Sequence, residues 1–432
     1  MNIYMDLLQK VTALAKRRGI IYPNSEIYGG IAGFYDYGPV GVEMKNNLKR
    51  YWWKNMVDRR ENVVSIDGTI ITHPKVWEAS GHIKGFGDEA IECKKCHARF
   101  RPEDIDGQCP KCGGKEFTKP REYNMLFETE IGVIEGEKLP AYLRGEACQT
   151  IYLDFKNVVD STRIQIPFGI AQIGKAFRNE ITPGRFTFRL REFEQWDMEY
   201  FVKPEDMAKT FEYWKEERMK FYKGLFRKSD SLRFYQHPKD KLAFYAKDAY
   251  DIEYLAPWGW AETEGIHWRG DYDLKQHMEF SGTDLTYTDP KTGEKFIPNI
   301  VETSGGVDRT FLMLLLDAYE EEELENGNTR TVLKVNKDIA AYRAAIFPLV
   351  ANKEELVNKA RDVFDLLSND IKVVWDARGN IGKRYRYQDE IGTPYCITID
   401  YDTLEDDTVT IRDRDTMGQE RVKVDQLKQL IN

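Results

Sequence analysis

The chain has 432 residues, of which 41% are hydrophobic and 31% are charged, and it is long enough for two or three domains with sizeable cores. No apolar run approaches the length of a membrane span, and the N-terminal stretch does not resemble a secretory signal, so we expect a cytoplasmic protein with no membrane partner. The net charge of −9 excludes a uniformly basic nucleic-acid-binding surface but leaves room for a local basic patch.

The N-terminal part predicts two helices, a loop and a strand. Apolar residues recur at helical spacing in residues 1–20, and a loop rich in Gly and Tyr follows this amphipathic helix. A second helix is expected over about 39–60, opening at a proline whose missing N–H costs no hydrogen bond. A strand over 63–72 should follow it. On pattern alone, this is an ordinary helix–strand unit.

Two CxxC pairs separated by twelve residues give the strongest spacing signal in the chain. Two such knuckles present four thiolates to a tetrahedral zinc ion, and the loop between them has too few apolar residues to fold without metal. All four ligand positions are thiolates and none is left open, so we expect a structural zinc. The candidate ligands are Cys93, Cys96, Cys109 and Cys112, in a zinc-ribbon insertion over about 91–116.

The stretch from Gly169 to Lys175 fits the first seven positions of a phosphate-binding P-loop. Ala176 follows it, so the hydroxyl that would hold magnesium is missing, and apolar residues fill the loop where backbone amides should be exposed. A strand rather than a helix is expected to begin at Phe177. We therefore reject a P-loop, and with it a kinase-type ATPase.

Residues 177–201 predict two antiparallel strands joined by a polar Pro-Gly turn. Phe186, Phe188 and Leu190 alternate with charged or polar residues, as in a half-buried strand. Arginines face several acids along the two strands. An ordinary hairpin pairs such charges for a few tenths of a kcal/mol each, so the charge pattern by itself leaves that interpretation open.

Further along, residues 204–226 predict a helix and residues 227–256 are mixed, so we expect a helical or mixed insertion over about 204–256. Residues 299–315 predict a strand, a tight Gly-Gly turn and an apolar helix. Arg309 falls in the first turn of that helix, where a cation opposes the helix dipole. This unfavourable placement makes more sense if an anion lies there.

The composition changes after about residue 336 to alternating strands and helices, which predicts a small α/β domain with a mixed sheet over 340–432. Strands are expected over 344–350, 371–376, 395–400 and 409–416, with a helix over 352–367. A cluster of basic and aromatic residues in this domain suits a stacked single-stranded RNA loop, and a solvated turn is the alternative. The cluster consists of Lys383, Arg384, Tyr385, Arg386 and Tyr387.

Several segments match the wording of one enzyme family. FRNE, a loop and then R-x-R-E-F-E-Q closely resemble motif 2 of the class II aminoacyl-tRNA synthetases, in the form that the glycyl-specific members use. YGPVGVEMKN and PKVWEASGH resemble their motif 1, and NIVETSGGVDRTFLMLL resembles motif 3. GKRYRYQDEIGTP and VTIRDRD resemble the anticodon-binding domain of the glycyl, threonyl, prolyl and histidyl enzymes. The resemblance implies an α+β fold: an antiparallel class II sheet flanked by helices over 1–336, carrying the zinc-ribbon insertion, and an α/β anticodon-binding domain over 340–432.

The resemblance also implies site residues. Arg178 would grip the α-phosphate of ATP and Arg309 the γ-phosphate, while Glu180 would face the adenine amino group, so these three would carry catalysis. A guanidinium suits these tasks because it binds a phosphate bidentately and stabilises charge that develops on phosphorus. GWAETEGIHWRGDYDL resembles a family segment that usually reads GW-x-E-L-E-G-I-A-x-R-x-D-F-D-L, with Thr263 in place of Leu. The implied ATP-binding residues are Arg178, Asn179, Glu180, Phe188, Arg189, Leu190, Arg191, Glu192, Phe193, Glu262, Thr263, Gly306, Val307, Asp308 and Arg309.

LRGEACQTIY resembles the family's LRPETAQGIF and makes Glu146 a substrate-binding carboxylate. Glycine offers only an ammonium, a carboxylate and two α-hydrogens, so its site should surround the ammonium with acids and leave no volume for a methyl group. Rejection of larger substrates by steric clash requires no editing domain. Asp197 departs from the family's usual Glu, and Gly184 replaces a common Arg. The implied glycine-binding residues are Arg101, Glu146, Phe193, Glu194, Gln195, Trp196, Asp197, Glu302, Thr303, Ser304, Gly305 and Gly306.

The implied reaction has two steps. Glycine attacks the α-phosphorus of ATP and releases pyrophosphate, and the glycyl-adenylate then esterifies the terminal ribose of the glycine tRNA. ATP as a substrate, Mg²⁺ to screen its phosphates and structural Zn²⁺ are the expected ligands, and a homodimer built on motif 1 is the expected assembly. Two alternatives stay open: another synthetase of the same subgroup, threonyl or prolyl, and a non-catalytic RNA-binding paralogue. The acids Glu146, Asp197 and Glu302 count against the first alternative. The motif arginines Arg178 and Arg309, which are both present, count against the second.

Overall fold

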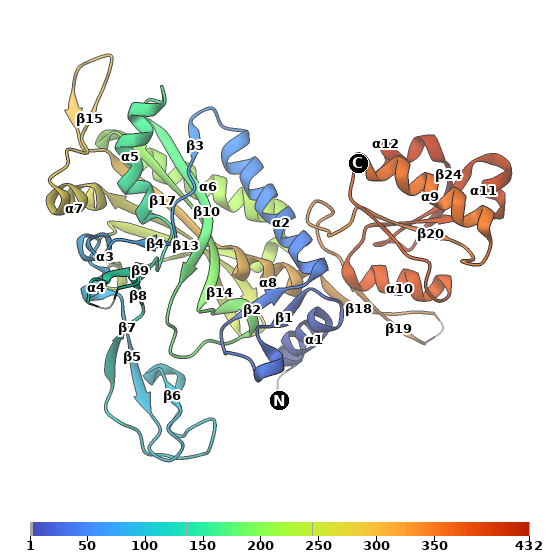
Figure 1. Cartoon of the computed structure of the whole chain (residues 1–432), viewed down its shortest axis with the longest axis horizontal. Coiled ribbons are helices and arrows are strands. Elements are labelled where there is room, and N and C mark those ends of the chain that lie inside the picture. Colours follow the sequence, from blue (N-terminus) through green and yellow to red (C-terminus); the bar gives the residue numbers. More distant parts are fainter. Residues whose placement is uncertain (1–2, 135, 244, 326, 432) are drawn as a thin grey trace.

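The computed structural model describes residues 3–134, 136–243, 245–325 and 327–431. Its largest element is a seven-stranded sheet in the order β12-β13-β14-β17-β11-β10-β3, and all neighbours are antiparallel except β3 and β10 (Figure 1). The predicted antiparallel class II sheet is therefore confirmed. The strands are β3 Val63–Ser65, β10 Phe168–Phe177, β11 Glu192–Val202, β12 Leu232–Gln236, β13 Asp248–Ala256, β14 Gly259–Gly270 and β17 Asn299–Gly306.

Helices cover one face of this sheet and bury its main core. In α2 the side chains of Val40, Met44, Leu48 and Trp52 repeat every four residues and are all buried, so they form one stripe. Trp52 stacks on Trp196 of β11 with ring centroids 5.7 Å apart. The helices of this layer are α1 Ile3–Arg17, α2 Pro39–Trp53 with a π-helical extension Lys54–Asp58, α6 Met207–Leu225 and α8 Val307–Ala318, with the short strands β1 Ile21–Pro23 and β2 Tyr35–Tyr37 beside them.

The other face of the sheet carries a second core at one end and polar groups in the middle. Phe155 of α5 packs on Phe168 and Phe201 at the end of β10 and β11. Successive side chains of a strand point to opposite faces, so the even-numbered residues of β11 near 196–202 point to the main core and the odd-numbered ones to this face. The elements here are α5 Gln149–Ser161, α7 Tyr272–Ser281, β15 Tyr287–Thr288 and β16 Lys295–Phe296.

The strand predicted over 63–72 is two short strands in different sheets. β3 joins the main sheet, whereas β4 (Ile71–Thr72) pairs with β9 in a separate three-stranded sheet. Gly68 lies between them, and its backbone contacts both Gln172 and Arg144, so the chain turns away from the main sheet here. The remaining elements of this region are β8 Phe127–Ile131, β9 Leu139–Leu143, α3 Pro74–Ala79 and α4 His82–Gly85.

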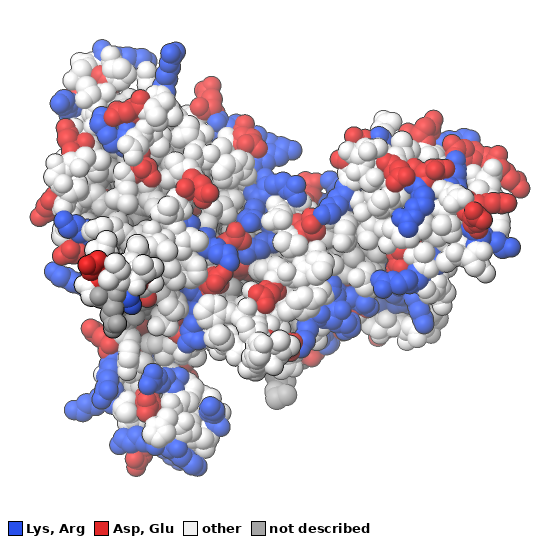
Figure 2. Space-filling model, viewed as in Figure 1, with Lys and Arg blue, Asp and Glu red and all other residues white. Residues whose placement is uncertain are grey.

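A small module projects from the body at the lower left of Figure 1. It contains β5 Gly87–Glu92, β6 Arg99–Phe100 and β7 Arg121–Asn124, with β5 in the middle. Figure 2 shows Lys and Arg side chains gathered over its tip, in a chain whose net charge is −9. We call residues 87–124 the four-cysteine module, since the two CxxC pairs lie within it.

Phe177 ends a strand and does not begin one, so that prediction was wrong. The P-loop-like stretch forms most of β10, and its residues pair with β11 from Phe168↔Phe201 to Phe177↔Glu192. A loop and a 3-10 turn then cover the residues whose alternation predicted a strand. The backbone of Arg185 and Phe186 is left-handed, with φ of 55° and 56°, which no strand accommodates.

The segment 204–256 was predicted as an insertion, but both its helix and its strands belong to the main fold. α6 packs on the sheet, β12 is the edge strand, and β13 lies between β12 and β14. Edge strands keep one side exposed, so the Lys, Asp and Tyr residues there diluted the strand pattern.

The C-terminal unit is the predicted α/β domain with a mixed sheet. Its strand order is β21-β20-β22-β23-β24, parallel among the first three strands and antiparallel beyond them. A hairpin, β18 Tyr319–Glu323 and β19 Thr329–Leu333, leads into it beneath α10 (Figure 1). Its elements are β20 Ala344–Pro348, α9 Glu354–Ser368, β21 Val373–Trp375, α10 Ile381–Ile391, β22 Tyr395–Ile399, α11 Tyr401–Asp406, β23 Thr408–Asp413, β24 Gln419–Lys423 and α12 Leu427–Ile431. Among the described residues, no helix has the length and apolar character needed to cross a bilayer.

Candidate active site

A pocket opens on the polar face of the main sheet, between the loop after β10 and the start of α8. Residues far apart in the sequence meet there, from the segments that resemble motifs 2 and 3. The predicted strand and helix are present, but Gly305 and Gly306 are the last residues of β17 and α8 begins directly at Val307, so there is no separate Gly-Gly turn between them. The end of β17 brings the backbone to the pocket wall. The lining residues are Arg178, Glu180, Thr187, Phe188, Arg189, Leu190, Phe193, Gln195, Glu262, Ser304, Gly305, Gly306, Asp308 and Arg309.

Two arginines stand at this pocket with their guanidinium groups held in place. Arg178 Nε donates to the Gly145 carbonyl at 3.0 Å, and its guanidinium lies over the Phe193 ring, 5.4 Å from the centroid. The guanidinium also lies over the Phe86 ring at 5.2 Å, so Nε and the ring contacts orient it and leave the terminal nitrogens for a bidentate anion contact. Arg309, in the first turn of α8, lies over the Phe188 ring at 4.6 Å and pairs with Glu262 at 3.0 Å. The positive charge of Arg309, and then that of Arg178, lowers the pKa of Glu262, whose side chain is about half exposed.

Glu180 also lines the pocket and is almost fully buried. Its Oε2 is 3.1 Å from Arg101 Nη2 and 4.0 Å from Arg189 Nε. Arg101 was expected among the glycine-binding residues, but the structure places it against Glu180. Arg191 supports this corner from outside, because it donates to the carbonyls of Glu180 and Ala32.

Beyond the pocket lies a group of buried carboxyl side chains, which we call the acidic floor. Glu146, Asp197 and Glu302, all predicted from the sequence, are each at most 9% exposed. Asp197 and Ser304 are directly opposed on β11 and β17, so the register of the two strands brings these side chains together. Both oxygens of Asp197 are buried without a hydrogen-bond partner among the described residues. Burial and the neighbouring Glu302 raise the pKa of Asp197 to about 8.

Cations hold the other two acids in the ionised form. Arg269 Nη1 lies 2.9 Å and His267 Nδ1 lies 2.8 Å from Glu302 Oε2, and against the effect of burial they lower the pKa of Glu302 to about 2. His82 Nε2 is 3.2 Å from Glu146 Oε1 and holds the pKa of that carboxyl well below its usual range, although burial opposes it. The floor therefore combines fixed negative charge with a carboxyl group that stays protonated near neutral pH.

Three residues that contact this group of acids or belong to it were not predicted from the sequence: Arg269, His267 and Glu199. The family wording quoted above contains the arginine, so Arg269 had a usable signal. Glu199 stands two residues after Asp197 on the same strand face, a relation that the strand period alone reveals. His267 stands where the family wording has Ala, and nothing in the sequence pointed to its contact with Glu302.

Several predicted residues lie outside the pocket. Glu194 pairs with Lys45 and Lys49 of α2, and Trp196 belongs to the main core, because even-numbered residues of β11 point to the helical face. Asp308, though it touches the pocket, accepts hydrogen bonds from Tyr37, Lys45 and the Glu194 amide and so ties α8 to the sheet. Thr263, Thr303 and Val307 are buried, and the Thr263 hydroxyl donates to the Ile252 carbonyl. Glu192 forms an ion pair with Lys175 at the surface. The backbone amide of Asn179 donates to the Met125 carbonyl.

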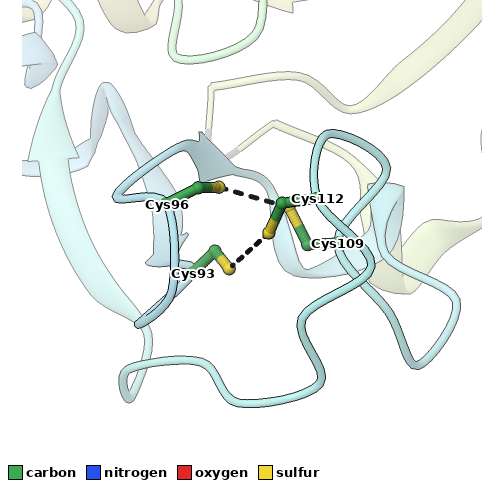
Figure 3. Close-up of side chains that lie close together, drawn as sticks. All are labelled: Cys93, Cys96, Cys109 and Cys112. Atoms are coloured by element: carbon green, nitrogen blue, oxygen red, sulfur yellow. Dashed lines mark hydrogen bonds between the residues drawn. The ribbon is translucent and has the colours of Figure 1, made fainter.

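The four cysteines of the two CxxC pairs converge on one point (Figure 3). Their sulfur atoms all lie within 4.8 Å of one another, and both the Cys93–Cys112 and the Cys96–Cys109 separations are 3.6 Å. A tetrahedral zinc with Zn–S bonds of about 2.3 Å requires sulfurs about 3.8 Å apart. The residues present therefore fit a zinc ion with four thiolate ligands.

The basic and aromatic cluster of the C-terminal unit is mostly structural, which corrects its interpretation as an RNA-facing surface. Arg384 is 2% exposed and donates to the carbonyls of Pro348, Ala377, Arg378 and Gly379. Tyr385 shares a hydrogen bond with Thr398, Tyr387 lies against Arg18, and Arg386 donates to the Thr329 carbonyl, which leaves Lys383 as the exposed member. Helix α10 therefore uses these residues to contact its own sheet, the hairpin and the N-terminal part of the chain.

Comparisons with known proteins agree with this geometry. Residues 129–319 match the family model "tRNA synthetase class II core domain (G, H, P, S and T)", and residues 343–432 match the model "Anticodon binding domain". The chain is 50% identical to the glycine–tRNA ligase of Clostridium tetani, with 98% of each chain covered. It is 49% identical to that of Borreliella burgdorferi, over 98% of this chain and 96% of the relative, and 47% identical to that of Clostridium acetobutylicum, over 98% of each. The chain belongs to the glycine–tRNA ligase family of class II aminoacyl-tRNA synthetases.

Proposed function

We propose that the protein activates glycine with ATP and transfers it to the 3′ end of the glycine tRNA. One observation carries this proposal. Two arginines that lie over aromatic rings, Arg178 and Arg309, stand at a pocket on the same sheet as the buried acids of the acidic floor. In the first step a glycine carboxylate oxygen bonds to the α-phosphorus of ATP and the bond to pyrophosphate breaks. In the second, a terminal ribose hydroxyl of the tRNA attacks the glycyl carbonyl, loses its proton, and AMP leaves.

The phosphate chain would lie between the two arginines. We assign Arg178 to the α-phosphate, Arg309 to the γ-phosphate, and Glu180 with Phe193 to the adenine. The attacking carboxylate is already ionised, so no general base is needed, and positioning with charge stabilisation carries the step. Bound Mg²⁺ would supply further screening of the phosphate charges.

The acidic floor gives the amino-acid end its specificity. The ammonium of glycine would be held by the buried side chains of Glu146, Asp197 and Glu302. Asp197 and Glu302 lie on the paired strands β11 and β17, and Glu146 lies shortly before α5. Ser304, opposite Asp197, accepts a hydrogen bond from Gln195 at 2.9 Å and closes the side where a larger substrate would extend. Arg101 is better placed for the ATP end than for this one.

Three further properties belong to this proposal. The four-cysteine module would hold a structural zinc, since its thiolates have the spacing that a tetrahedral ion requires. The protein would act as a homodimer in the cytoplasm, with the segment that resembles motif 1 in the interface. Exposed apolar residues near that segment, including Ile70 and Ile71, are suited to contact a second copy.

Amino-acid-dependent exchange between ATP and pyrophosphate tests the proposal. Purified, zinc-loaded protein is assayed with each standard amino acid in turn. Exchange with glycine alone is the expected result, and charging of glycine tRNA then tests the second step. Exchange with another amino acid would mean that the floor is assigned to the wrong substrate, and no exchange with any would favour the non-catalytic paralogue.

A further inference from the structure

One side chain of the four-cysteine module reaches the candidate ATP site. Arg101 follows β6 directly and lies in the twelve-residue loop between the two CxxC pairs. Its Nη2 is 3.1 Å from Glu180 Oε2, and its side chain is only 13% exposed. The loop between the two CxxC pairs, which would bind zinc, therefore also places a buried positive charge at the pocket.

The fold of the module sets the position of Arg101. β5 pairs with β6 through Ile91↔Phe100 and Glu92↔Arg99, and the Cys93 amide donates to the Ala98 carbonyl, so the first knuckle and the strand before Arg101 are one unit. Asp88 of β5 forms a second ion pair with the same guanidinium.

The apolar content of the module is too low to hold this arrangement unaided. Ala90 and Ile91 are buried, but the loop between the knuckles is mainly exposed. Four thiolates within 4.8 Å of one another repel when no cation lies among them. The path of the loop, and with it the place of Arg101, depends on what the four sulfurs bind.

Glu180 depends on Arg101 in turn. Glu180 is 7% exposed, and the second cation near its carboxylate, Arg189, is more distant at 4.0 Å. A buried carboxylate that loses its closest partner either protonates or rotates toward water. Both changes alter the surface that the base of ATP would meet.

We propose that the four-cysteine module controls ATP affinity by holding Arg101 against Glu180, which makes Arg101 a positioning residue for the ATP site. This inference rests on the proposed function only in taking Glu180 as an adenine contact. It assigns the module an effect on one substrate, because the acidic floor lies on other elements and has its own cations.

The test compares Arg101→Ala with Arg99→Ala in zinc-loaded protein. Arg99 lies in the same module but pairs with Glu92 at the surface, so it is the matched control. We expect Arg101→Ala to weaken equilibrium binding of a fluorescent ATP analogue by about tenfold, the loss typical of a charge-assisted hydrogen bond, and to raise the KM for ATP equally. The KM for glycine and kcat should stay within about twofold, Arg101→Lys should recover part of the affinity, and Arg99→Ala should leave both substrates unchanged.

Zinc removal separates this mechanism from general damage. Chelation should weaken binding of the ATP analogue by the same factor as Arg101→Ala, while chelation of the Arg101→Ala protein should add little further loss. Equal losses on chelation in both proteins would overturn the proposal, as would a rise in the KM for glycine comparable with that for ATP. Since nucleotide binding is measured directly, failure of the proposed function would show separately, as missing glycine-dependent exchange in the unmodified protein.

Discussion

Glu199 of β11 and Glu302 of β17 are directly opposed residues on adjacent strands, and both carboxyl groups are buried. Arg269 and His267 keep Glu302 ionised, whereas both oxygens of Glu199 lack a hydrogen-bond partner among the described residues. Burial and the charge of Glu302 raise the pKa of Glu199 well above its usual range. Two carboxylates this close in a low dielectric do not both ionise, so the sheet register decides which acids of the floor are charged.

The first prediction concerns the pH dependence of glycine binding. The pKa of Asp197 is raised from 3.8 to about 8, so the free protein carries this carboxyl mainly protonated below pH 8. An ammonium binds the ionised form, and binding must therefore displace a proton. The KM for glycine should fall as the pH rises from about 6 to 8, by up to about tenfold per unit, and then level off. Exchange kinetics at saturating ATP measure this profile.

The variant Asp197→Asn provides its control. It has nearly the same shape and cannot ionise, so its KM for glycine should be higher and should lose this part of the pH dependence. An unchanged slope in the variant would show that another group, such as His267 beside Glu302, releases the proton.

Replacement of Arg309 should slow activation strongly. Arg309→Ala removes the guanidinium from the start of α8, where it lies over Phe188, and the rate of ATP–pyrophosphate exchange should fall by about 100-fold or more. Arg378→Ala is a suitable comparison because that side chain is 90% exposed on the C-terminal unit. A comparable loss in both variants would indicate that Arg309 supports the fold and not the reaction.

Loss of Arg269 should be costly to stability. Arg269→Met leaves Glu302 and Asp273 as buried charges without their shared partner, which typically costs about 3–5 kcal/mol of unfolding free energy. Urea denaturation measures this, with Arg233→Met as the control. Arg233 pairs with Glu253 at the surface, so its loss should cost less than about 1 kcal/mol. Equal stability of the two variants would contradict the role given to Arg269.

Variants in the basic and aromatic cluster of α10 distinguish a structural role of these residues from a role in RNA binding. Arg384→Ala leaves four backbone carbonyls without their donor, so we expect a loss of about 2 kcal/mol or more in stability. Lys383→Ala, one residue earlier and exposed, should leave stability unchanged. Thermal denaturation distinguishes the two, and a weaker tRNA affinity for Arg384→Ala without loss of stability would restore the RNA-facing interpretation.

The sequence pattern predicted those helices and strands whose apolar residues recur with one clear period. The apolar stripe of α2, the strand and the apolar helix that meet after Gly306, and the alternating C-terminal elements all follow such patterns. The spacing of the cysteines predicted their convergence because each CxxC knuckle has one geometry.

The errors arose where tertiary contacts override local pattern. Phe186, Phe188 and Leu190 alternate like a strand, but Phe186 packs on Tyr35, Phe188 lies against Trp258 and Arg309, and the backbone between β10 and β11 follows those contacts. No local pattern indicates that Arg384 is enclosed by carbonyls from its own domain. The segments identified by resemblance include the residues that line the pocket, and strand register decides which of the implied residues face it.

Asp389 of α10 accepts from two arginines at once, Arg330 of the hairpin at 2.8 Å and Arg412 of β23 at 2.9 Å. Arg330 belongs to the segment before the C-terminal unit, and the side chains of Arg330 and Asp389 are each about 1% exposed. Separation of the two units would therefore cost each buried charge one partner, since Asp389 would keep only Arg412 and Arg330 would keep only Glu322 as an ion-pair partner. Heating should accordingly melt the whole chain in a single calorimetric step, and a C-terminal fragment starting after the hairpin should melt earlier than the same residues within the intact protein.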